Sequence, residues 1–147
     1  MIEQPSEYKF DDIKMGDKKR FAVTADDSLV DNFALISGDY NPLHMDENYA
    51  KTTTFKKRVC HGMLLASFFS RLVGMYLPGK NALYFSQTLN FQSPCFVGDQ
   101  VTIEGEVIEK SQSTKIITIK TTILDKLGKI VVDGIAKVLV REIDIKQ

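Results

Sequence analysis

The chain has 147 residues, which is the size of one ordinary domain and enough to bury a core without disulfides or metals. Hydrophobic residues make up 44% and charged residues 26%, a composition typical of soluble globular proteins and not of disordered ones. Its 19 lysines and arginines equal its 19 aspartates and glutamates, so no overall positive charge exists to attract nucleic acid.

The sequence also argues against a membrane protein and against a disulfide-rich one. Residues 1–5 lack the basic and apolar regions of a signal peptide. The longest apolar-rich stretch, residues 63–77, includes Arg71 and is shorter than the ~20 residues of a membrane span, so we expect no membrane partner. Cys60 and Cys95 form no C-x-x-C pair, which indicates neither a zinc site nor a disulfide framework, and two free thiols fit a cytoplasmic location.

The first half of the chain predicts one strand and two helices. Residues 1–8 are expected to form a flexible tip, and residues 18–24 a strand. Thr24 can cap the helix that follows, since aspartates occupy its first turn, and Gly38 is a natural end for it. A second, short helix is predicted over about residues 46–51.

The second half begins with a long apolar helix and continues with strands. Between Gly62 and Leu77 apolar residues cover nearly every face of a helix, which predicts that it is buried on all sides. Beyond it the apolar residues alternate, as in strands with one buried face. The predicted strands cover residues 82–91, 100–110, 115–124 and 130–141, with turns at 97–99 and 125–129.

Strands that are segregated from helices in this way predict an α+β fold with an antiparallel sheet. A long helix that is apolar all round needs cover, and a curved sheet wrapped around it supplies most of that cover. We therefore expect a single hot-dog domain over residues 1–147. One such sheet has open edges and leaves part of the helix uncovered, so we also expect a homodimer.

Both histidines lie in segments with candidate chemistry. In the first, residues 37–44 (Ser-Gly-Asp-Tyr-Asn-Pro-Leu-His), Asp39 precedes His44 by five positions. Pro42 fixes its own φ and favours an extended Asn41, so a rigid excursion can return the imidazole to the carboxylate. The pair could hold one water molecule, with Asn41 orienting either group, although each residue alone could equally be part of a turn or a structural histidine.

In the second segment, residues 60–63 (Cys-His-Gly-Met), Gly62 stands where the apolar helix begins. The first amides of a helix lack intrahelical acceptors and carry the positive end of its dipole, so they could stabilise the oxygen of a thioester enolate. Gly62 could equally be required for close packing. His61 is interpreted as a packed polar group, and Ser70, two turns further on, could support the pair if it faces the pocket.

Motifs for other chemistries are missing from the sequence. It has no G-x-S-x-G, Walker loop, dinucleotide fingerprint or cluster of metal ligands, so water chemistry without a metal or cofactor is expected. Lys56, Lys57 and Arg58 form a short basic run, which is either a solvated loop or a contact to phosphates. Cys60 is a poor candidate nucleophile, because nothing else resembles a cysteine hydrolase.

The segment 37–44 resembles the signature of the MaoC-like, hydratase-2 family of (R)-specific enoyl-CoA hydratases. The resemblance extends to residues 58–64, 77–79 and 91–99, and so spans most of the chain. Cys60 is a departure, because the family more often has a small or β-branched residue there. Family members have a hot-dog fold, and the short ones resemble single subunits that dimerise with the site near the interface.

The resemblance implies roles for several residues. Asp39 and His44 would be the catalytic pair, and Gly62 would donate its backbone N–H to the thioester oxygen. Ser70 would lie beside the pair. An acyl tunnel that sets the chain length of the substrate would be lined by Val73 and Val138.

We therefore predict reversible syn hydration of trans-2-enoyl-CoA to (R)-3-hydroxyacyl-CoA, with coenzyme A as part of the substrate. The basic run at residues 56–58 is then a candidate contact for the coenzyme phosphates. Three alternatives stay open: dehydration of 3-hydroxyacyl groups on acyl carrier protein, thioester hydrolysis, and a non-catalytic acyl-thioester-binding subunit. The joint presence of Asp39 and His44 argues against a mere binder, and an Asp–His loop suits water addition to an alkene better than hydrolysis.

Overall fold

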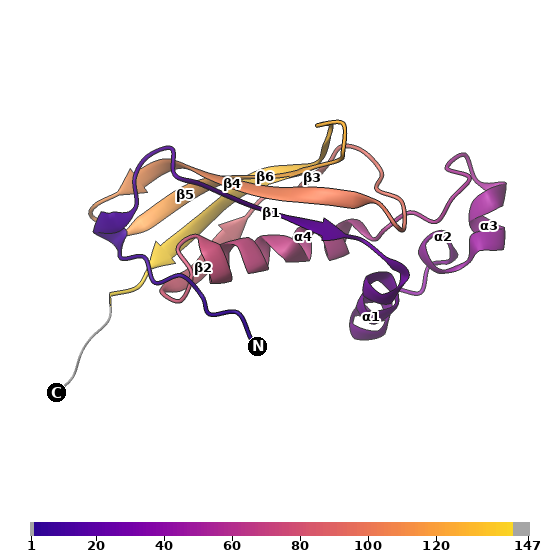
Figure 1. The fold of residues 1–147 in the computed structure, drawn as a ribbon, viewed down its shortest axis with the longest axis horizontal. Helices are drawn as coiled ribbons and strands as arrows, with labels where there is room; N and C mark the ends of the chain where they lie inside the picture. Colours follow the sequence, from indigo (N-terminus) through magenta and orange to yellow (C-terminus); the bar gives the residue numbers. More distant parts are fainter. Residues whose placement is uncertain (1, 143–147) are drawn as a thin grey trace.

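The computed structural model describes residues 2–142. Its largest element is a six-stranded antiparallel sheet in the order β1-β4-β5-β6-β2, with β3 also paired to β6. The long strands lie together on one side of a central helix (Figure 1). The strands are β1 (Lys18–Thr24), β2 (Ala82–Gln87), β3 (Asn90–Phe91), β4 (Gln100–Ser111), β5 (Ile116–Leu124) and β6 (Ile130–Val140).

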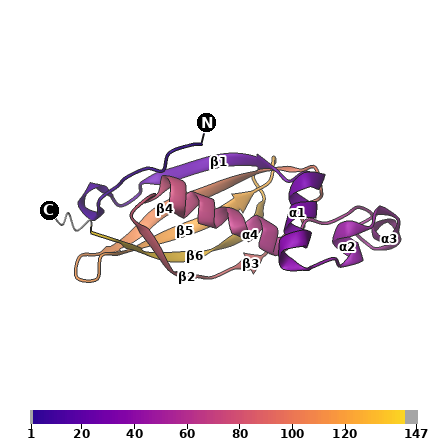
Figure 2. The ribbon, with the colours of Figure 1, turned by 90° about the horizontal axis from the view of Figure 1, so that it is seen from below.

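The central helix, α4, crosses one face of the sheet. Helices α1, α2 and α3 lie beyond one end of the sheet, near the first turn of α4 (Figure 2). The predicted α+β fold with an antiparallel sheet over a central helix is therefore confirmed. No helix within residues 2–142 has the length and apolarity needed to cross a membrane. The helical elements are a 3-10 turn η1 (Phe10–Asp12), α1 (Asp27–Ser37), α2 (Pro42–Met45), α3 (Glu47–Thr52), α4 (Gly62–Arg71) and a π turn η2 (Leu72–Tyr76).

One face of α4 packs against the sheet. Its Leu65 and Phe69 share an apolar cluster with Ile103 of β4, Ile123 of β5 and Val132 of β6. The prediction that this helix is buried on all sides is wrong for the single chain, because one sheet covers only one side of a helix. The uncovered face carries four exposed residues, Met63, Ser67, Ser70 and Arg71.

The cap of α1 is Asp26, not Thr24 as predicted. The Asp26 Oδ1 accepts a hydrogen bond from the Leu29 N–H at 3.0 Å, whereas Thr24 ends β1 and pairs with Gln100. The other end of α1 is as predicted. Gly38 takes a left-handed backbone with φ of 77°, which glycine adopts without strain, and turns the chain towards the segment with Asp39.

The predicted strand over residues 82–91 is divided into β2 and β3. At the break, the Thr88 N–H donates to the Ile135 carbonyl at 2.9 Å, and the Thr88 hydroxyl accepts from the Ile135 N–H at 2.8 Å. Gly134 allows the chain to come this close, because a Cβ on it would lie 1.8 Å from the Thr88 carbonyl oxygen. The alternating pattern gave no sign of the break, since it depends on this distant glycine.

The N-terminal segment is held more firmly than predicted. The Ser6 N–H donates to the Met75 carbonyl at 2.9 Å, and the Tyr8 N–H donates to the Pro78 carbonyl at 3.3 Å. A flexible tip over residues 1–8 is therefore wrong for Ser6 to Tyr8, while Met1 lies outside the described residues.

We expect Gly134→Ala to lower the free energy of unfolding by roughly 1–3 kcal/mol, because the new methyl group must displace the Thr88 backbone. Urea denaturation followed by circular dichroism measures the change. Gly74→Ala is the control, since a Cβ there meets nothing within 4 Å and its stability should match the wild type or exceed it slightly. Equal urea midpoints for Gly134→Ala and wild type would show that the close contact between Gly134 and the Thr88 backbone does not require a glycine.

Candidate active site

The rigid excursion predicted over residues 37–44 is a turn followed by the short helix α2. The Asp39 Oδ1 accepts a hydrogen bond from the Asn41 N–H at 3.1 Å, which forms the turn. The Asn41 Oδ1 then accepts from a backbone N–H two positions on, at 3.0 Å, and caps α2 with Pro42 as its first residue. Asn41 therefore acts by starting the helix that carries His44, and its amide oxygen is not free to orient the pair.

The His44 ring has a defined orientation. Its Nδ1 lies 2.6 Å from the Val59 carbonyl oxygen, and because a carbonyl can only accept, Nδ1 carries the proton. In the neutral ring the Nε2 is then an acceptor, and it lies 4.0 Å from the Asp39 Oδ2. The structure thus brings Asp39 and His44 together. The imidazole is mostly buried, with 17% of its side chain exposed, whereas the carboxylate is 47% exposed.

His61 connects the two members of the pair. Its Nε2–H donates to the Asp39 carbonyl at 2.9 Å, and its ring lies 4.1 Å from the His44 ring, centroid to centroid, at an angle of 32°. Phe33 contacts the ring of His61 as well. The ring is 2% exposed, and within the described residues its Nδ1 has no hydrogen-bond partner. The predicted packed polar group is confirmed, with the added finding that it holds Asp39 and supports His44.

Arg58 ties the same segment to α1. Its Nε donates to the His44 carbonyl at 2.6 Å, and its guanidinium lies 2.7 Å from the Asp27 carboxylate and 3.8 Å from that of Asp31. With these partners, and with only 14% of its side chain exposed, Arg58 is not free to bind a coenzyme phosphate. That part of the prediction is corrected: the residue acts in positioning the backbone of α2.

A cavity of about 440 Å³ opens beside the pair, and both His44 and Gly62 line it. Gly62 is the first residue of α4, where the backbone N–H has no intrahelical acceptor. A Cβ on Gly62 would lie 2.7 Å from the Phe91 ring, so the close-packing interpretation of this glycine is correct. Gly62 itself is one of the residues that line the cavity. Most other lining residues are apolar: Phe55, Val59, Cys60, Met63, Leu65, Phe91, Pro94, Cys95 and Val132, together with Gln92 and Ser93.

Of the residues predicted for the site, only His44 and Gly62 line this cavity; Asp39 reaches it through its position beside His44, and Ser70, Val73 and Val138 lie away from it. Ser70 is exposed on the uncovered face of α4. Val73 and Val138 are 1% and 0% exposed within an apolar cluster that also contains Leu77 and Ile119. An acyl chain would have to separate packed residues to reach them, so their assignment to a tunnel stays a prediction. Conversely, the loop around Phe91 to Cys95 enters the site although only the family resemblance pointed to it.

Asp39, His44 and His61 are also residue types that bind metals, and one ligand atom of each lies within 4.8 Å of the others. Each imidazole, however, already donates a ring N–H to a backbone carbonyl. The other nitrogen of His61 is sealed from solvent, so this residue could bind a metal only by giving up its bond to Asp39. The geometry suits proton transfer better than metal binding, and a site without metal or cofactor stays a prediction.

A family model described as a MaoC like domain matches residues 11–128. The chain belongs to this family. The matched range contains Asp39, His44, His61 and Gly62, so the pair, the histidine that holds Asp39 and the glycine of the cavity all belong to the MaoC-like domain.

Individual MaoC-like proteins are similar over nearly the whole chain. An (R)-specific enoyl-CoA hydratase of Aeromonas caviae is 44% identical over 126 residues, which is 86% of this chain and 94% of the relative. A mitochondrial 3-hydroxyacyl-[acyl-carrier-protein] dehydratase of Arabidopsis thaliana is 31% identical, over 92% of this chain and 82% of its own length. The structure of the R-hydratase PhaJ1 from Pseudomonas aeruginosa in the unliganded form has a TM-score of 0.90 and 33% identity, and the similarity covers 98% of this chain and 95% of that one. The predicted family and hot-dog fold are confirmed.

The role of His61 can be separated from simple packing by two substitutions. We expect His61→Met to lower kcat about tenfold with KM nearly unchanged, because loss of one hydrogen bond of ~1.4 kcal/mol loosens Asp39 but leaves the cavity wall intact. His61→Gln keeps a donor near the position of Nε2 and should keep most of the rate. The assay is hydration of an enoyl-CoA, the reaction for which the Aeromonas relative is named. Equal losses in both variants, or a change in KM alone, would contradict this role.

Proposed function

We propose that this protein is an (R)-specific enoyl-CoA hydratase, which adds water reversibly to trans-2-enoyl-CoA and forms (R)-3-hydroxyacyl-CoA. One observation carries the proposal. The Asp39 carboxylate and the His44 Nε2 lie 4.0 Å apart, and His44 and Gly62, the first residue of α4, line the same cavity. The similarity to the Aeromonas hydratase over 86% of this chain supports the same reaction.

The pair is spaced to hold a water molecule. At 4.0 Å the two atoms are too far apart to bond each other and near enough to bond the same water. The His44 Nε2 accepts the proton of this water while Asp39 holds it in place, since the ring proton is committed to Val59. The water oxygen bonds to C3, and the electrons of the double bond move to the thioester oxygen as an enolate. The pair then returns a proton to C2 on the same face, which gives syn addition.

Gly62 supplies the charge stabilisation that this mechanism needs. The negative charge develops on the thioester oxygen, and the Gly62 N–H at the start of α4 adds the positive end of the helix dipole to a hydrogen bond. Loss of one such donor typically costs ~2.7–4 kcal/mol of transition-state stabilisation. The mainly apolar walls of the cavity strengthen the interaction, because they lower the local dielectric constant.

Coenzyme A enters as part of the substrate, and no further cofactor takes part in these steps. Lys56 and Lys57 are exposed and follow Phe55, which lines the cavity, so they are the candidate contacts for the coenzyme phosphates. The acyl chain extends towards Val73 and Val138 if the packed cluster around them opens. The two free thiols fit a cytoplasmic location.

A second candidate is dehydration of 3-hydroxyacyl groups on acyl carrier protein. The similarity to the Arabidopsis dehydratase favours it, and the same pair and amide catalyse either direction of the reaction. A comparison of kcat/KM for matched CoA and carrier-protein thioesters decides between the two carriers.

We also propose a homodimer. Strand β2 forms one edge of the sheet, and it carries Leu83 and Phe85, which are 51% and 69% exposed. Beside it the uncovered face of α4 exposes Met63 and Ser70. Pairing of two β2 edges would end the exposed edge and place Leu83 and Phe85 next to apolar side chains of the second subunit. A second subunit near α4 would also cover Ser70. Ser70 is exposed in one chain, so its predicted support of a catalytic pair would require contact with the second subunit.

Asp39→Asn and His44→Gln should each reduce the hydration of crotonyl-CoA by about 10²–10⁴-fold, because each removes one of the two groups that hold and deprotonate the water. The rate follows from the loss of the conjugated-thioester absorbance, and the chirality of the product tests the (R) assignment. Asp11→Asn makes the same chemical change at an exposed position outside the site and should leave the rate unaltered. A near-wild-type rate in either site variant would exclude this mechanism.

The wild type should elute as a dimer in gel filtration with light scattering, and Phe85→Lys should shift it towards a monomer by placing a charge in the apolar contact. The matched control is Leu127→Lys at the tip of the β5–β6 hairpin, 93% exposed, which should stay dimeric. Circular dichroism checks that both variants fold. A dimeric Phe85→Lys would place the interface elsewhere.

A further inference from the structure

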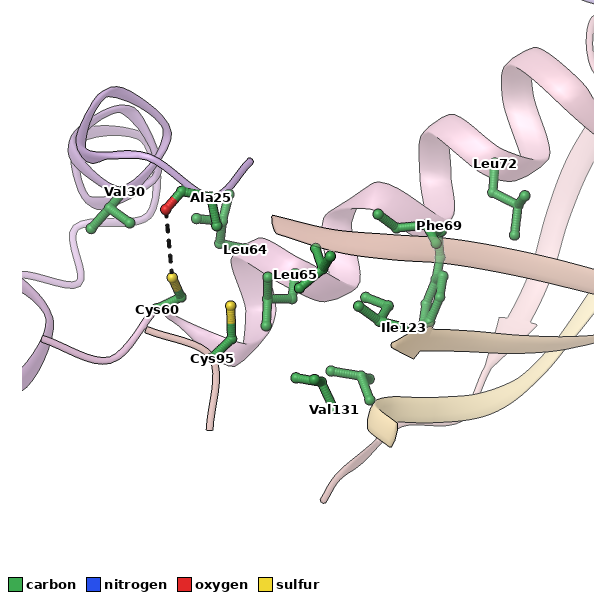
Figure 3. Packing of buried hydrophobic residues seen from close by; sticks show 13 residues of the cluster. Ala25, Val30, Cys60, Leu64, Leu65, Phe69, Leu72, Cys95, Ile123 and Val131 are labelled. Atoms are coloured by element: carbon green, nitrogen blue, oxygen red, sulfur yellow. Dashed lines mark hydrogen bonds between the residues drawn. The ribbon is translucent and has the colours of Figure 1, made fainter. Parts of the chain in front are cut away.

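The only two cysteines of the sequence come together in the wall of the substrate cavity. Val59 and Phe96 form an isolated antiparallel bridge, and next to it the Cys60 N–H donates to the Cys95 carbonyl at 2.7 Å. Cys60 and Cys95 are therefore directly opposite each other on adjacent extended segments, a position that brings Cβ atoms about 4.5–5.5 Å apart. Figure 3 shows both sulfur atoms on the same side of the two segments.

The two thiols share a buried environment that opens towards the substrate. Each cysteine is 3% exposed, and both line the cavity that contains His44 and Gly62. The neighbouring Cys95 thiol lowers the pKa of Cys60, and the Cys60 Sγ also lies 3.9 Å from the Ala25 carbonyl oxygen (Figure 3). The proximity of Cys60, together with burial, raises the pKa of Cys95. Cys60 is therefore the sulfur that reacts as a thiolate, and Cys95 is the neighbour that keeps its proton.

We propose that Cys60 and Cys95 are an oxidation site, a dithiol that a hydroperoxide converts reversibly to an intramolecular disulfide in the cavity wall. The opposite placement of the two residues across the bridge leaves their Cβ atoms about 1 Å farther apart than the ~3.8 Å of a disulfide, so a small movement of the Cys60 segment towards Cys95 allows the bond to form. The cavity offers a path for a molecule as small as hydrogen peroxide to sulfur atoms that are otherwise covered. No other part of the proposed mechanism uses these two thiols.

The chemistry balances in two steps. The Cys60 thiolate attacks one oxygen of the peroxide, the O–O bond breaks, and the products are a Cys60 sulfenic acid and hydroxide. The Cys95 sulfur then attacks the Cys60 sulfur, the S–O bond breaks, and water leaves with the Cys95 proton. Two electrons pass from the sulfur atoms to the peroxide, and a thiol reductant reverses the change.

The disulfide affects the site because Cys60 directly precedes His61 and Gly62. Bond formation draws the two sulfur atoms to about 2.05 Å, well inside the contact distance of two thiols, and moves the Cys60 segment towards Cys95. His61 holds Asp39, and Gly62 carries the amide of the cavity wall, so both lose their alignment with His44. This consequence rests on the proposed hydratase function, whereas formation of the disulfide does not.

The chemical test uses the purified full-length protein and hydrogen peroxide. We expect both free thiols to disappear together, with the loss of two hydrogen atoms in intact mass and a cross-linked peptide pair joining Cys60 to Cys95. Dithiothreitol should restore both thiols. Cys60→Ser and Cys95→Ser cannot form the link, and their melting temperatures check that they fold. Sulfinic acid without a cross-link, a link between two chains, or two surviving thiols in folded protein would each overturn the proposal.

The functional test measures crotonyl-CoA hydration before and after the same treatment. The wild type should lose at least about fivefold in rate and recover it with dithiothreitol, while Cys95→Ser should keep the rate that it has before treatment. If the protein hydrates no enoyl-CoA, the mass measurement still shows whether the disulfide forms. Failure of the hydratase proposal can therefore be distinguished from failure of the disulfide proposal. A disulfide that forms without a change in rate would refute its effect on the active site.

Discussion

The hydrogen bond from the His44 ring to the Val59 carbonyl is the constraint on which the candidate site depends. It determines which ring nitrogen carries the proton, and so leaves the Nε2 as an acceptor facing Asp39. Two further bonds join the same segments: the Val59 N–H donates to the Leu43 carbonyl at 3.2 Å, and the Arg58 Nε donates to the His44 carbonyl. Together they dock a four-residue helix, which would be unstable alone, onto the chain that leads into α4.

The same docking determines where the amide of Gly62 lies. The chain from Arg58 to Gly62 runs between α2 on one side and the segment of Cys95 on the other, and hydrogen bonds hold it to both. Beyond Gly62, burial of Phe69 and its neighbours against the sheet sets the direction of α4. The positive end of the helix is thereby aimed at a cavity that also contains the imidazole. Packing of the core therefore determines the direction of the helix dipole at the site.

Within residues 2–142, the outer face of α4 is exposed and β2 is one of the two edge strands of the sheet. Met63 of α4 and Phe91 of β3, a strand that pairs with β6 as β2 does, are exposed and also line the cavity. Burial of apolar surface is the main favourable term in association, so assembly and completion of the site are expected to involve the same residues. The exposure of Ser70 in one chain is understandable on this basis.

The antiparallel sheet, the central helix and most of the other elements could be predicted from the sequence, because alternation and helical spacing are local properties of the chain. Asp39, His44 and Gly62 could be named because they lie in short motifs, each within a few residues. The bond of His61 to Asp39, the pairing of Arg58 with α1 and the meeting of Cys60 with Cys95 were decided only by the tertiary structure. So were the break at Thr88 and the burial of Val73 and Val138 away from the cavity. Each of these depends on residues that are distant along the chain and adjacent in space, and a local pattern contains no information about such contacts.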